Sequence, residues 1–449
     1  MAYFSAIHGA GVTLSTFAQP LRAENQLARR EQGQMAGGYF RLGWKRLTAL
    51  SLCLLAGCAQ INIAGSGTSS QINASGQVIA ETYFGMHVGF VNPSTPWPAV
   101  PFGTWRLWDA NVAWKDLEPK KGVWEFNKLD GFIALAAQHH VEIILPLALT
   151  PQWASTTPGQ SCAYTPGNAA PPTNIQDWID YVQAVTSRYK GKIAYYEMWN
   201  EANSATMWTG TPEQLVALQE AAYSAIKSND PDAQLISANL ESAGGLPYMQ
   251  NLLSLGYARS ADIIGYHLYV SPNQPEVIAS LSAKIFSLLN QYGVNKPVWD
   301  TETGWLPPST FDSEDQAASV AVRALLVARS SGIERFLWYE WDNHCCVSLY
   351  MTEADNATPT RAALAYANLQ KWLVGSTMSP CSPNFEGVWS CSLQFSGGAP
   401  GMILWNPQGT LAVKENLSWT PTVIEDMYGN DSPASDNTLT VDEDPVLIR

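Results

Sequence analysis

The sequence is short of positive charge, and this shortage limits the partners that the protein can have. Its 449 residues include 25 Lys and Arg against 39 Asp and Glu, which gives a formal net charge of −14. After residue 46, no cluster of basic residues is interleaved with aromatic ones, although nucleic-acid-binding surfaces need such clusters. We therefore expect no nucleic-acid partner. The negative net charge also disfavours polyanionic substrates, although less strongly.

Motifs for metals and phosphates are missing as well. The seven cysteines form no Cys-x-x-Cys pair and the six histidines form no cluster, so neither a metal nor a cofactor is expected. No Gly-rich phosphate loop follows the first predicted strand, which disfavours an open, doubly wound sheet. The chain is instead rich in large side chains, with 18 Trp and 18 Tyr. Most of these belong in a core, and a minority at strand ends can form flat platforms for sugar rings.

The N-terminal region has the features of an export signal. Residues 41–58 read "RLGWKRLTALSLCLLAGC", with a basic start and an apolar stretch from Leu47 to Leu55. That stretch is too short to span a bilayer and is typical of a secretory signal. Its ending resembles the lipobox of bacterial lipoproteins, which implies that Cys58 becomes the lipidated first residue of an exported, periplasmic or cell-surface protein. A plain cleaved signal is the alternative, and we hypothesise that translation begins at Met35.

The central part of the chain alternates between two kinds of segment. Residues 58–78 are rich in Gly, Ser, Asn and Thr, which predicts a flexible tether. Beyond them, strand-like runs alternate with stretches of helical periodicity. The eight runs cover residues 82–90, 103–109, 141–149, 192–200, 234–240, 262–270, 296–302 and 334–341. Eight such repeats predict a closed (β/α)8 barrel, an α/β fold, over residues 79–375.

Local signals refine this prediction. Four prolines in residues 91–102 predict a loop where the first outer helix would lie. Asn127 and Thr211 are expected to cap the helices that they precede or open. After residue 375, short alternating runs broken by Gly, Asn and Pro predict a small antiparallel β-sandwich domain over residues 376–449.

Five cysteines lie beyond the signal, and export permits disulfides. Cys381 and Cys391 flank a short hairpin-like segment and are the expected pair. Cys162, Cys345 and Cys346 allow one further bridge and one free thiol, which the sequence does not assign.

In a barrel of this kind, functional side chains gather at the C-terminal ends of the strands. Side chains suited to catalysis or sugar binding at these ends are His87, Arg106, Asp109, Trp153, Asn200, Glu201, His267, Tyr269, Glu302, Trp338, Glu340, Trp341 and Asp342. Glu201 and Glu302 end the fourth and seventh strands, 302 − 201 = 101 residues apart. Three strand–helix units of a barrel of roughly 250 residues span about 94. The two carboxyl groups are therefore expected to face one pocket, as in retaining glycosidases.

Three stretches of the sequence resemble segments of a known enzyme family. "MWNEAN" (198–203) and "PVWDTETGW" (297–305) resemble the strand-four and strand-seven segments of clan A glycoside hydrolases. Residues 106–130 are similar to the corresponding region of glycoside hydrolase family 39, and within it to endoglycosidases associated with bacterial biofilm exopolysaccharides. The resemblance covers most of residues 82–375.

This resemblance implies roles for individual residues. Glu201 would be the acid/base, Glu302 the nucleophile, and Asn200 would bind the sugar 2-hydroxyl. Arg106, His267 and Tyr269 would surround Glu302 and keep it ionised. The aromatic candidates for substrate stacking are Trp341, with Trp338 as the alternative, and Trp153 at a neighbouring subsite. For Arg106 a structural ion pair with Asp109 or another barrel carboxylate is the alternative, and for His267 and Tyr269 a buried hydrogen-bonded pair.

Together these features predict a membrane-tethered, monomeric retaining glycosidase that acts within a polysaccharide chain and needs no cofactor. An exo-β-glycosidase of the same clan is one alternative. The other is a non-catalytic carbohydrate-binding or export lipoprotein. Against the latter, Asn200 and both glutamates are present together, which a purely binding protein has no chemical need to keep.

Overall fold

The computed structural model describes residues 76–89, 91, 96–342, 344, 346–413, 417–434 and 439–449. All of them belong to one compact unit, Gly67–Arg449. The expected signal at 1–57, the lipidation site Cys58 and most of the expected tether lie outside the described residues. At the end of that tether, the Gly76 amide donates to the Met378 carbonyl at 3.2 Å. In the described part of the chain, no helix combines the length and apolar character needed to cross a bilayer.

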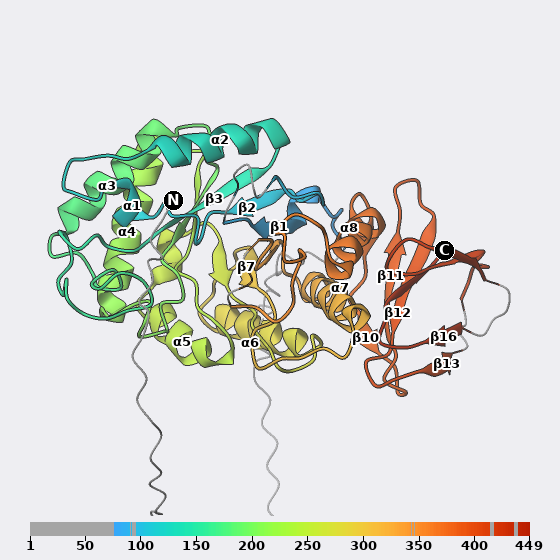
Figure 1. Cartoon of the computed structure of the whole chain (residues 1–449). Helices are drawn as coiled ribbons and strands as arrows, with labels where there is room; N and C mark the ends of the chain where they lie inside the picture. The colour runs from blue at the N-terminus through green and yellow to red at the C-terminus, as the bar shows by residue number, and fades with distance from the viewer. Residues whose placement is uncertain are drawn as a thin grey trace, which may run out of the picture. The chain divides into compact units, whose positions relative to one another are not determined.

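Eight parallel strands form a barrel (Figure 1), and each lies within a predicted run except β7, which extends one residue beyond its run. They are β1 (Phe84–His87), β2 (Thr104–Arg106), β3 (Glu142–Leu147), β4 (Tyr195–Met198), β5 (Gln234–Ile236), β6 (Ile264–Tyr266), β7 (Val298–Thr303) and β8 (Phe336–Trp338). Their order in the sheet is β5-β4-β3-β2-β1-β8-β7-β6. The first strand therefore pairs with the last, as a barrel requires.

The remaining seam lies between β5 and β6, and single hydrogen bonds bridge it. The Ser237 amide donates to the Ile263 carbonyl at 2.9 Å, and the His267 amide donates to the Leu240 carbonyl at 2.8 Å. An isolated parallel bridge also joins Glu241 to His267. These contacts join the two edges of the sheet, and the predicted (β/α)8 barrel is confirmed.

Helices cover the outside of the barrel. They are α1 (Trp114–Leu117), α2 (Asn127–His139), α3 (Ile175–Arg188), α4 (Pro212–Asn229), α5 (Leu246–Ser254), α6 (Val277–Gln291), α7 (Glu314–Ser330) and α8 (Arg361–Leu373). Residues 96–103, the described part of the proline-rich connection between β1 and β2, contain no helix, as predicted.

One predicted cap is present and one is wrong. The Thr211 hydroxyl accepts the Gln214 amide at 3.2 Å, and the Gln214 side chain accepts the Thr211 amide at 2.8 Å, a capping box at the start of α4. Asn127 is instead the first residue inside α2. Phe126 is the N-cap, because its carbonyl already accepts the first helical bond, from Asp130 at 2.8 Å.

The C-terminal domain consists of short antiparallel strands. They are β9 (Thr377–Met378), β10 (Ser382–Pro383), β11 (Trp389–Gln394), β12 (Pro400–Trp405), β13 (Leu411–Val413), β14 (Val423–Glu425), β15 (Asp431–Pro433), β16 (Leu439–Val441) and β17 (Val446–Ile448). A seven-stranded sheet runs β10-β11-β12-β17-β14-β15, with β9 beside β11, and β13 pairs with β16 separately. Leu404, Val413, Val441 and Ile448 of the two sheets share one apolar cluster, so the sheets pack together as a small β domain.

Helix α7 lies between the barrel strands and this domain (Figure 1). Residues from Ala318 to Arg329 are all buried, because the barrel, α8 and the β domain all pack against this helix. The Cys381 amide donates to the Ser330 hydroxyl at 2.6 Å, and the Trp405 indole donates to Glu276 at 2.8 Å. The β domain is thus fixed to the barrel by polar contacts as well as by packing.

The cysteines are partly assigned. The expected disulfide between Cys381 and Cys391 is present. Cys162 is a free thiol and half-buried. Cys346 is disulfide-bonded, with its partner outside the described residues. Of the three cysteines that the sequence left unassigned, Cys162 is therefore the free one.

Candidate active site

The fourth strand ends in a short backbone segment that presents Asn200 and Glu201. Trp199 and Glu201 both have φ of +45°, a left-handed conformation that residues other than glycine rarely adopt. Asn239, just beyond β5, supports this segment. Its Oδ1 accepts the Glu201 amide at 2.7 Å and its Nδ2 donates to the Trp199 carbonyl at 3.1 Å. Asn239 therefore stabilises the conformation that sets the direction of the Glu201 side chain.

The seventh strand presents Glu302 through an irregularity in the sheet. Trp299 packs in the apolar cluster inside the barrel, and strict alternation would point the third residue after it outward. The pairing of β7 with β8 shifts register between Asp300 and Thr303. An extra residue of this kind, as at a β-bulge, reverses the alternation. Glu302 consequently lies with the interior side chains, and its side chain is 7% exposed.

Arg106 links three of the site residues from below. This fully buried side chain on β2 donates from Nε to Glu197 at 2.5 Å, from Nη1 to Glu302 at 2.7 Å and from Nη2 to Asn200 at 2.7 Å. The planar guanidinium suits such a fork, because its donors have fixed directions. The partners of Arg106 are thus Glu197 and Glu302 rather than Asp109.

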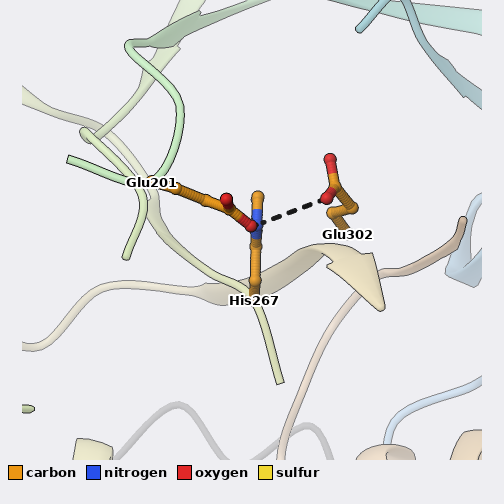
Figure 2. Close-up of side chains that lie close together, drawn as sticks. All are labelled: Glu201, His267 and Glu302. Atoms are coloured by element: carbon orange, nitrogen blue, oxygen red, sulfur yellow. Dashed lines mark hydrogen bonds and ion pairs between the residues drawn. The ribbon is translucent and has the colours of Figure 1, made fainter. Parts of the chain in front are cut away.

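His267 lies between the two glutamates (Figure 2). Its Nδ1 is 2.9 Å from Oε1 of Glu201 and 3.8 Å from Oε1 of Glu302. One oxygen of each glutamate and one ring nitrogen all lie within 4.8 Å of one another. The Tyr269 hydroxyl donates to Glu302 Oε1 at 2.9 Å. Strands β4, β6 and β7 thus bring the predicted residues to one point.

The pKa values of this group are strongly shifted. Burial raises the pKa of Glu201 to about 7, with Arg106 opposing. Burial also raises the pKa of Glu302 to about 7, with the charge of Glu201 adding to the rise and Arg106 opposing it. Burial lowers the pKa of His267 to about 4, so its ring is neutral at pH 7. Glu302 accepts hydrogen bonds from Arg106 and Tyr269 and Glu201 accepts neither, so a proton shared by the two carboxyl groups resides on Glu201.

The spacing of Glu201, His267 and Glu302 is also one that a metal ion requires. Arg106 argues against that use, because its Nη1 lies 2.7 Å from Glu302 Oε2 and carries a permanent positive charge beside the would-be ligand. The group is better suited to moving a proton between carboxyl groups than to holding a second cation.

The tryptophans predicted to stack on substrate are deeply placed. Trp341 is 1% exposed, its amide donates to the His87 carbonyl at 3.0 Å, and its indole N–H has no hydrogen-bond partner among the described residues. Trp338 is fully buried and stacks on Trp305 with an interplanar angle of 9°. Both tryptophans are part of the core, and both have an indole N–H without a described partner; Trp341 lies just beyond the end of β8.

Trp153 and His87 have other partners. The Trp153 indole donates to the Glu118 carbonyl at 2.9 Å, and its ring meets that of Trp114. None of its described contacts is with Glu201 or Glu302. His87 Nε2 donates to the Thr301 carbonyl at 2.9 Å, and burial lowers its pKa well below the usual value. His87 is a neutral, buried side chain whose Nδ1 has no described partner.

A second acidic group borders the first. The carboxylate of Asp109 accepts the Tyr164 hydroxyl at 2.5 Å and the Tyr339 hydroxyl at 2.7 Å. Next to it, Glu340 is 2% exposed and Asp342 is 1% exposed. Burial raises the pKa of Glu340 to about 9, and Asp109 and Asp342 add to this effect. A cavity of about 30 Å³ borders Asp109 and Tyr164.

Sequence reasoning missed three supporting residues. Glu197 lies inside the aromatic run of β4, where alternation alone marked it as one more strand position. Asn239 follows β5 and was treated as strand, although an Asn within an apolar run is a usable signal. Tyr164 lies in a long loop and no signal in the sequence identifies it.

Sequence and fold comparisons define the class as glycoside hydrolase-like and similar to clan A. Residues 106–167 match the family model described as beta-galactosidase, glycoside hydrolase family 42. A beta-xylosidase from Geobacillus stearothermophilus is 28% identical over 116 residues, which are 24% of this chain and 22% of that protein. The chain thus matches only about a fifth of the length of this relative.

Solved structures share the fold more widely. A family 39 glycoside hydrolase from Bacteroides cellulosilyticus has a TM-score of 0.65 at 18% identity, covering 82% of each chain. A monomeric beta-xylosidase from Caulobacter crescentus has a TM-score of 0.59 at 14% identity, covering 83% of this chain and 97% of that one. The catalytic domain of a GH30 xylanase from Talaromyces cellulolyticus has a TM-score of 0.58 at 13% identity, covering 84% and 98%. At such identities the likeness is one of fold.

Proposed function

We propose that the protein is a retaining glycoside hydrolase that works by double displacement. The observation that supports this most strongly is the spacing of Glu201 and Glu302, which have carboxyl oxygens within 4.8 Å of each other. Retaining enzymes hold their two carboxyl groups about 5–5.5 Å apart, whereas inverting enzymes leave about 6.5–9.5 Å for a water molecule. The hydrogen-bond partners of the two groups also differ, which suits an acid and a nucleophile.

In the first step, the Glu302 carboxylate attacks the anomeric carbon while Glu201 protonates the leaving oxygen, and a glycosyl ester forms on Glu302. In the second step, Glu201 takes a proton from a water molecule that attacks the same carbon and releases Glu302. Arg106 and Tyr269 keep Glu302 ionised before attack, because both donate to it.

Asn200 is suited to hold the sugar. Its Oδ1 is fixed by Arg106, while its Nδ2 is buried and has no described partner. A buried donor without a partner costs free energy, and a sugar 2-hydroxyl would satisfy it during the reaction. The indole N–H of Trp341 is a second buried donor of this kind.

We infer endo-acting cleavage of an exopolysaccharide or cell-wall glycan from the sequence resemblance, with exo-β-glycosidase action as the alternative. The similar beta-xylosidases and xylanase make xylan the first polymer to test. A lipid on Cys58 would hold the enzyme at the bacterial membrane. Intact-mass analysis of the membrane-fraction protein with and without Cys58→Ser tests this anchor, and an unlipidated N-terminus elsewhere would refute it.

Substitution of the nucleophile tests the proposed reaction. Wild type and Glu302→Gln are compared on xylan, glucan and mannose-rich polymers and on aryl glycosides. The amide cannot form the glycosyl ester, so we expect turnover to fall by at least about 1,000-fold. The matched control is Glu353→Gln, since Glu353 is an exposed glutamate in the loop after β8. Near-normal turnover by the Glu302 variant would refute the assignment.

A further inference from the structure

The loops at the C-terminal ends of the barrel strands carry almost no positive charge. Seven of the eight loops contain no Lys or Arg at all. The exception connects β2 to α2 and holds three lysines: Lys115 pairs with Asp116 at 2.6 Å, Lys121 pairs with Asp177 at 2.6 Å, and Lys120 is exposed. Substrates bind at this end of such barrels, so a sugar polymer would approach a face whose charge is predominantly negative.

Glu340, just beyond β8, is the unsatisfied member of this acidic face. It is 2% exposed, and neither of its carboxyl oxygens makes a well-aligned hydrogen bond among the described residues, although the Tyr339 hydroxyl is close enough to oppose the rise of its pKa. Burying a carboxyl group without a hydrogen-bond partner costs free energy. Such a group is best explained where a ligand supplies the missing hydrogen bond.

Asp342 lies close to Glu340, on the same side of the barrel mouth. A Cβ atom placed on Gly89 would lie 3.8 Å from Oε2 of Glu340 and 3.8 Å from Oδ1 of Asp342. The two carboxyl groups therefore flank one glycine, which has no side chain to fill the space between them. The Gly89 amide donates to Asp342 Oδ1 at 2.9 Å, so one of the two groups is fixed in position and the other awaits a partner.

Glu340 also interacts electrostatically with one of the reacting carboxyl groups. Asp109 and Glu302 both raise the pKa of Glu340 electrostatically, after the larger effect of its burial. Asp109 likewise raises the pKa of Glu201 and of Glu302. A sugar held by Glu201 and Glu302 therefore has Glu340 within its electrostatic range, and Asp342 lies beside Glu340.

Different ligands fit this arrangement unequally. A uronic acid or sulfated sugar would add negative charge to a face that is already predominantly negative. A metal ion needs tighter spacing, and in the described part of the chain only Glu201, His267 and Glu302 have it. A hydroxyl group would satisfy one oxygen but would bring no positive charge to offset the effects that raise the pKa of Glu340. An ammonium group supplies three donors and one positive charge, which matches two adjacent carboxyl groups.

We propose that the substrate contains amino sugars with a free amino group, and that Glu340 and Asp342 bind its ammonium group beside the glycosidic bond that is cleaved. This inference rests on the proposed glycosidase function and names the substrate class for that same site. De-N-acetylated hexosamine polymers have this chemistry. An N-acetyl group at the same position has no charge and is bulkier, so it should bind less well.

Binding to an inactive variant tests the proposal without requiring a particular linkage to be cleaved. Glu302→Gln is titrated by calorimetry with glucosamine and galactosamine oligomers and with their N-acetylated counterparts. We expect at least one amino oligomer to bind about 10-fold or more tightly than its acetylated partner. Adding Glu340→Gln should remove that difference, whereas adding Glu353→Gln should preserve it. Titrations at two salt concentrations separate a specific site from general attraction to an acidic surface.

Equal binding of the amino and N-acetylated oligomers would overturn the proposal, as would a preference that survives Glu340→Gln. Thermal unfolding shows that the Glu340 variant is folded, and we expect no loss of stability because the amide removes a buried acid without changing shape. Failure here leaves the proposed function standing if wild type cleaves neutral polymers through Glu302. If wild type cleaves no polymer or aryl glycoside at all, the proposed function itself fails.

Discussion

At the scale of single residues, the proposed chemistry depends on one proton and two buried carboxyl groups. Glu201 and Glu302 have similar burial but different hydrogen-bond partners. Arg106 and Tyr269 both donate to Glu302, and Glu201 instead faces the neutral ring of His267. The difference between acid and nucleophile therefore arises from the surroundings rather than from the residue type.

This arrangement predicts a bell-shaped dependence of kcat/KM on pH. Burial raises the pKa of each glutamate to about 7, and the active form carries one proton on Glu201. As the pH falls, Glu302 becomes protonated and stops attacking; as the pH rises, Glu201 loses the proton that the leaving group needs. We expect an optimum near pH 7. In Glu201→Gln, assayed with an activated aryl glycoside, the alkaline decline should disappear. A wild-type rate that keeps rising above about pH 9 would contradict this account.

Arg106 allows a second test at this scale. Replacing it by Met leaves Glu197 and Glu302 without their buried cation, which should lower the free energy of unfolding by about 3–5 kcal/mol. Urea unfolding measures this loss. The control is Arg188→Met, because the pair of Arg188 with Asp130 is exposed to solvent on both sides and contributes little. Equal stability of the two variants would show that Arg106 is not the centre of the network.

At the scale of elements, the end of β7 determines where the nucleophile points. Its register against β8 shifts just at Glu302. Gly304 then brings the two backbones together, because a Cβ there would lie 2.1 Å from the Tyr339 carbonyl oxygen. Tyr339 in turn holds Asp109 through its hydroxyl. The contact between these two strand ends thus connects both acidic groups of the site.

Gly304→Ala should therefore force the ends of β7 and β8 apart. We expect a loss of at least about 2 kcal/mol in unfolding free energy, since a backbone atom cannot move aside as a side chain does, and a parallel loss of turnover. Gly131→Ala is the matched control. Gly131 lies inside α2 with nothing within 4 Å of the added atom, so alanine should stabilise that helix by about 0.5–1 kcal/mol. An unchanged Gly304 variant would exclude the close contact.

These elements also show how far the sequence could be read. The spacing of Glu201 and Glu302 was predictable, because units of a barrel repeat at a nearly constant length. The register shift at Glu302 was not, since it depends on how β8 pairs with β7. Asn239 was likewise missed, because its role lies in contacts with Trp199 and Glu201 that are 38 or more residues away.

At the scale of the whole molecule, the fold is shared far more widely than the sequence. The family 39 structure superposes at a TM-score of 0.65 with 18% identity. Eight repeats, an apolar barrel interior and polar strand ends suffice to specify the barrel. The change in pattern after residue 375 predicts a β domain there, whereas the packing of this domain against α7 could not be predicted, because burial of the outer face of a helix depends on what packs there.

The net charge of the molecule follows from the sequence, but only the fold shows where that charge lies. A net charge of −14 describes the average surface. The barrel shows that loops without cations gather at the end where the catalytic candidates lie. The negative charge of the sequence only made polyanionic substrates less expected. The concentration of acidic loops at the site, together with the buried Glu340, supports the proposal of a cationic sugar.

The most direct test of the central claim is the configuration of the product as it is first released. Wild-type enzyme hydrolyses a substrate of known anomeric configuration, and proton NMR records the first sugar to form before mutarotation mixes the anomers. Two displacements, at Glu302 and then by water, predict a first product with the configuration of the substrate. A first product of the opposite configuration would show a single displacement and would contradict the role of Glu302 as nucleophile.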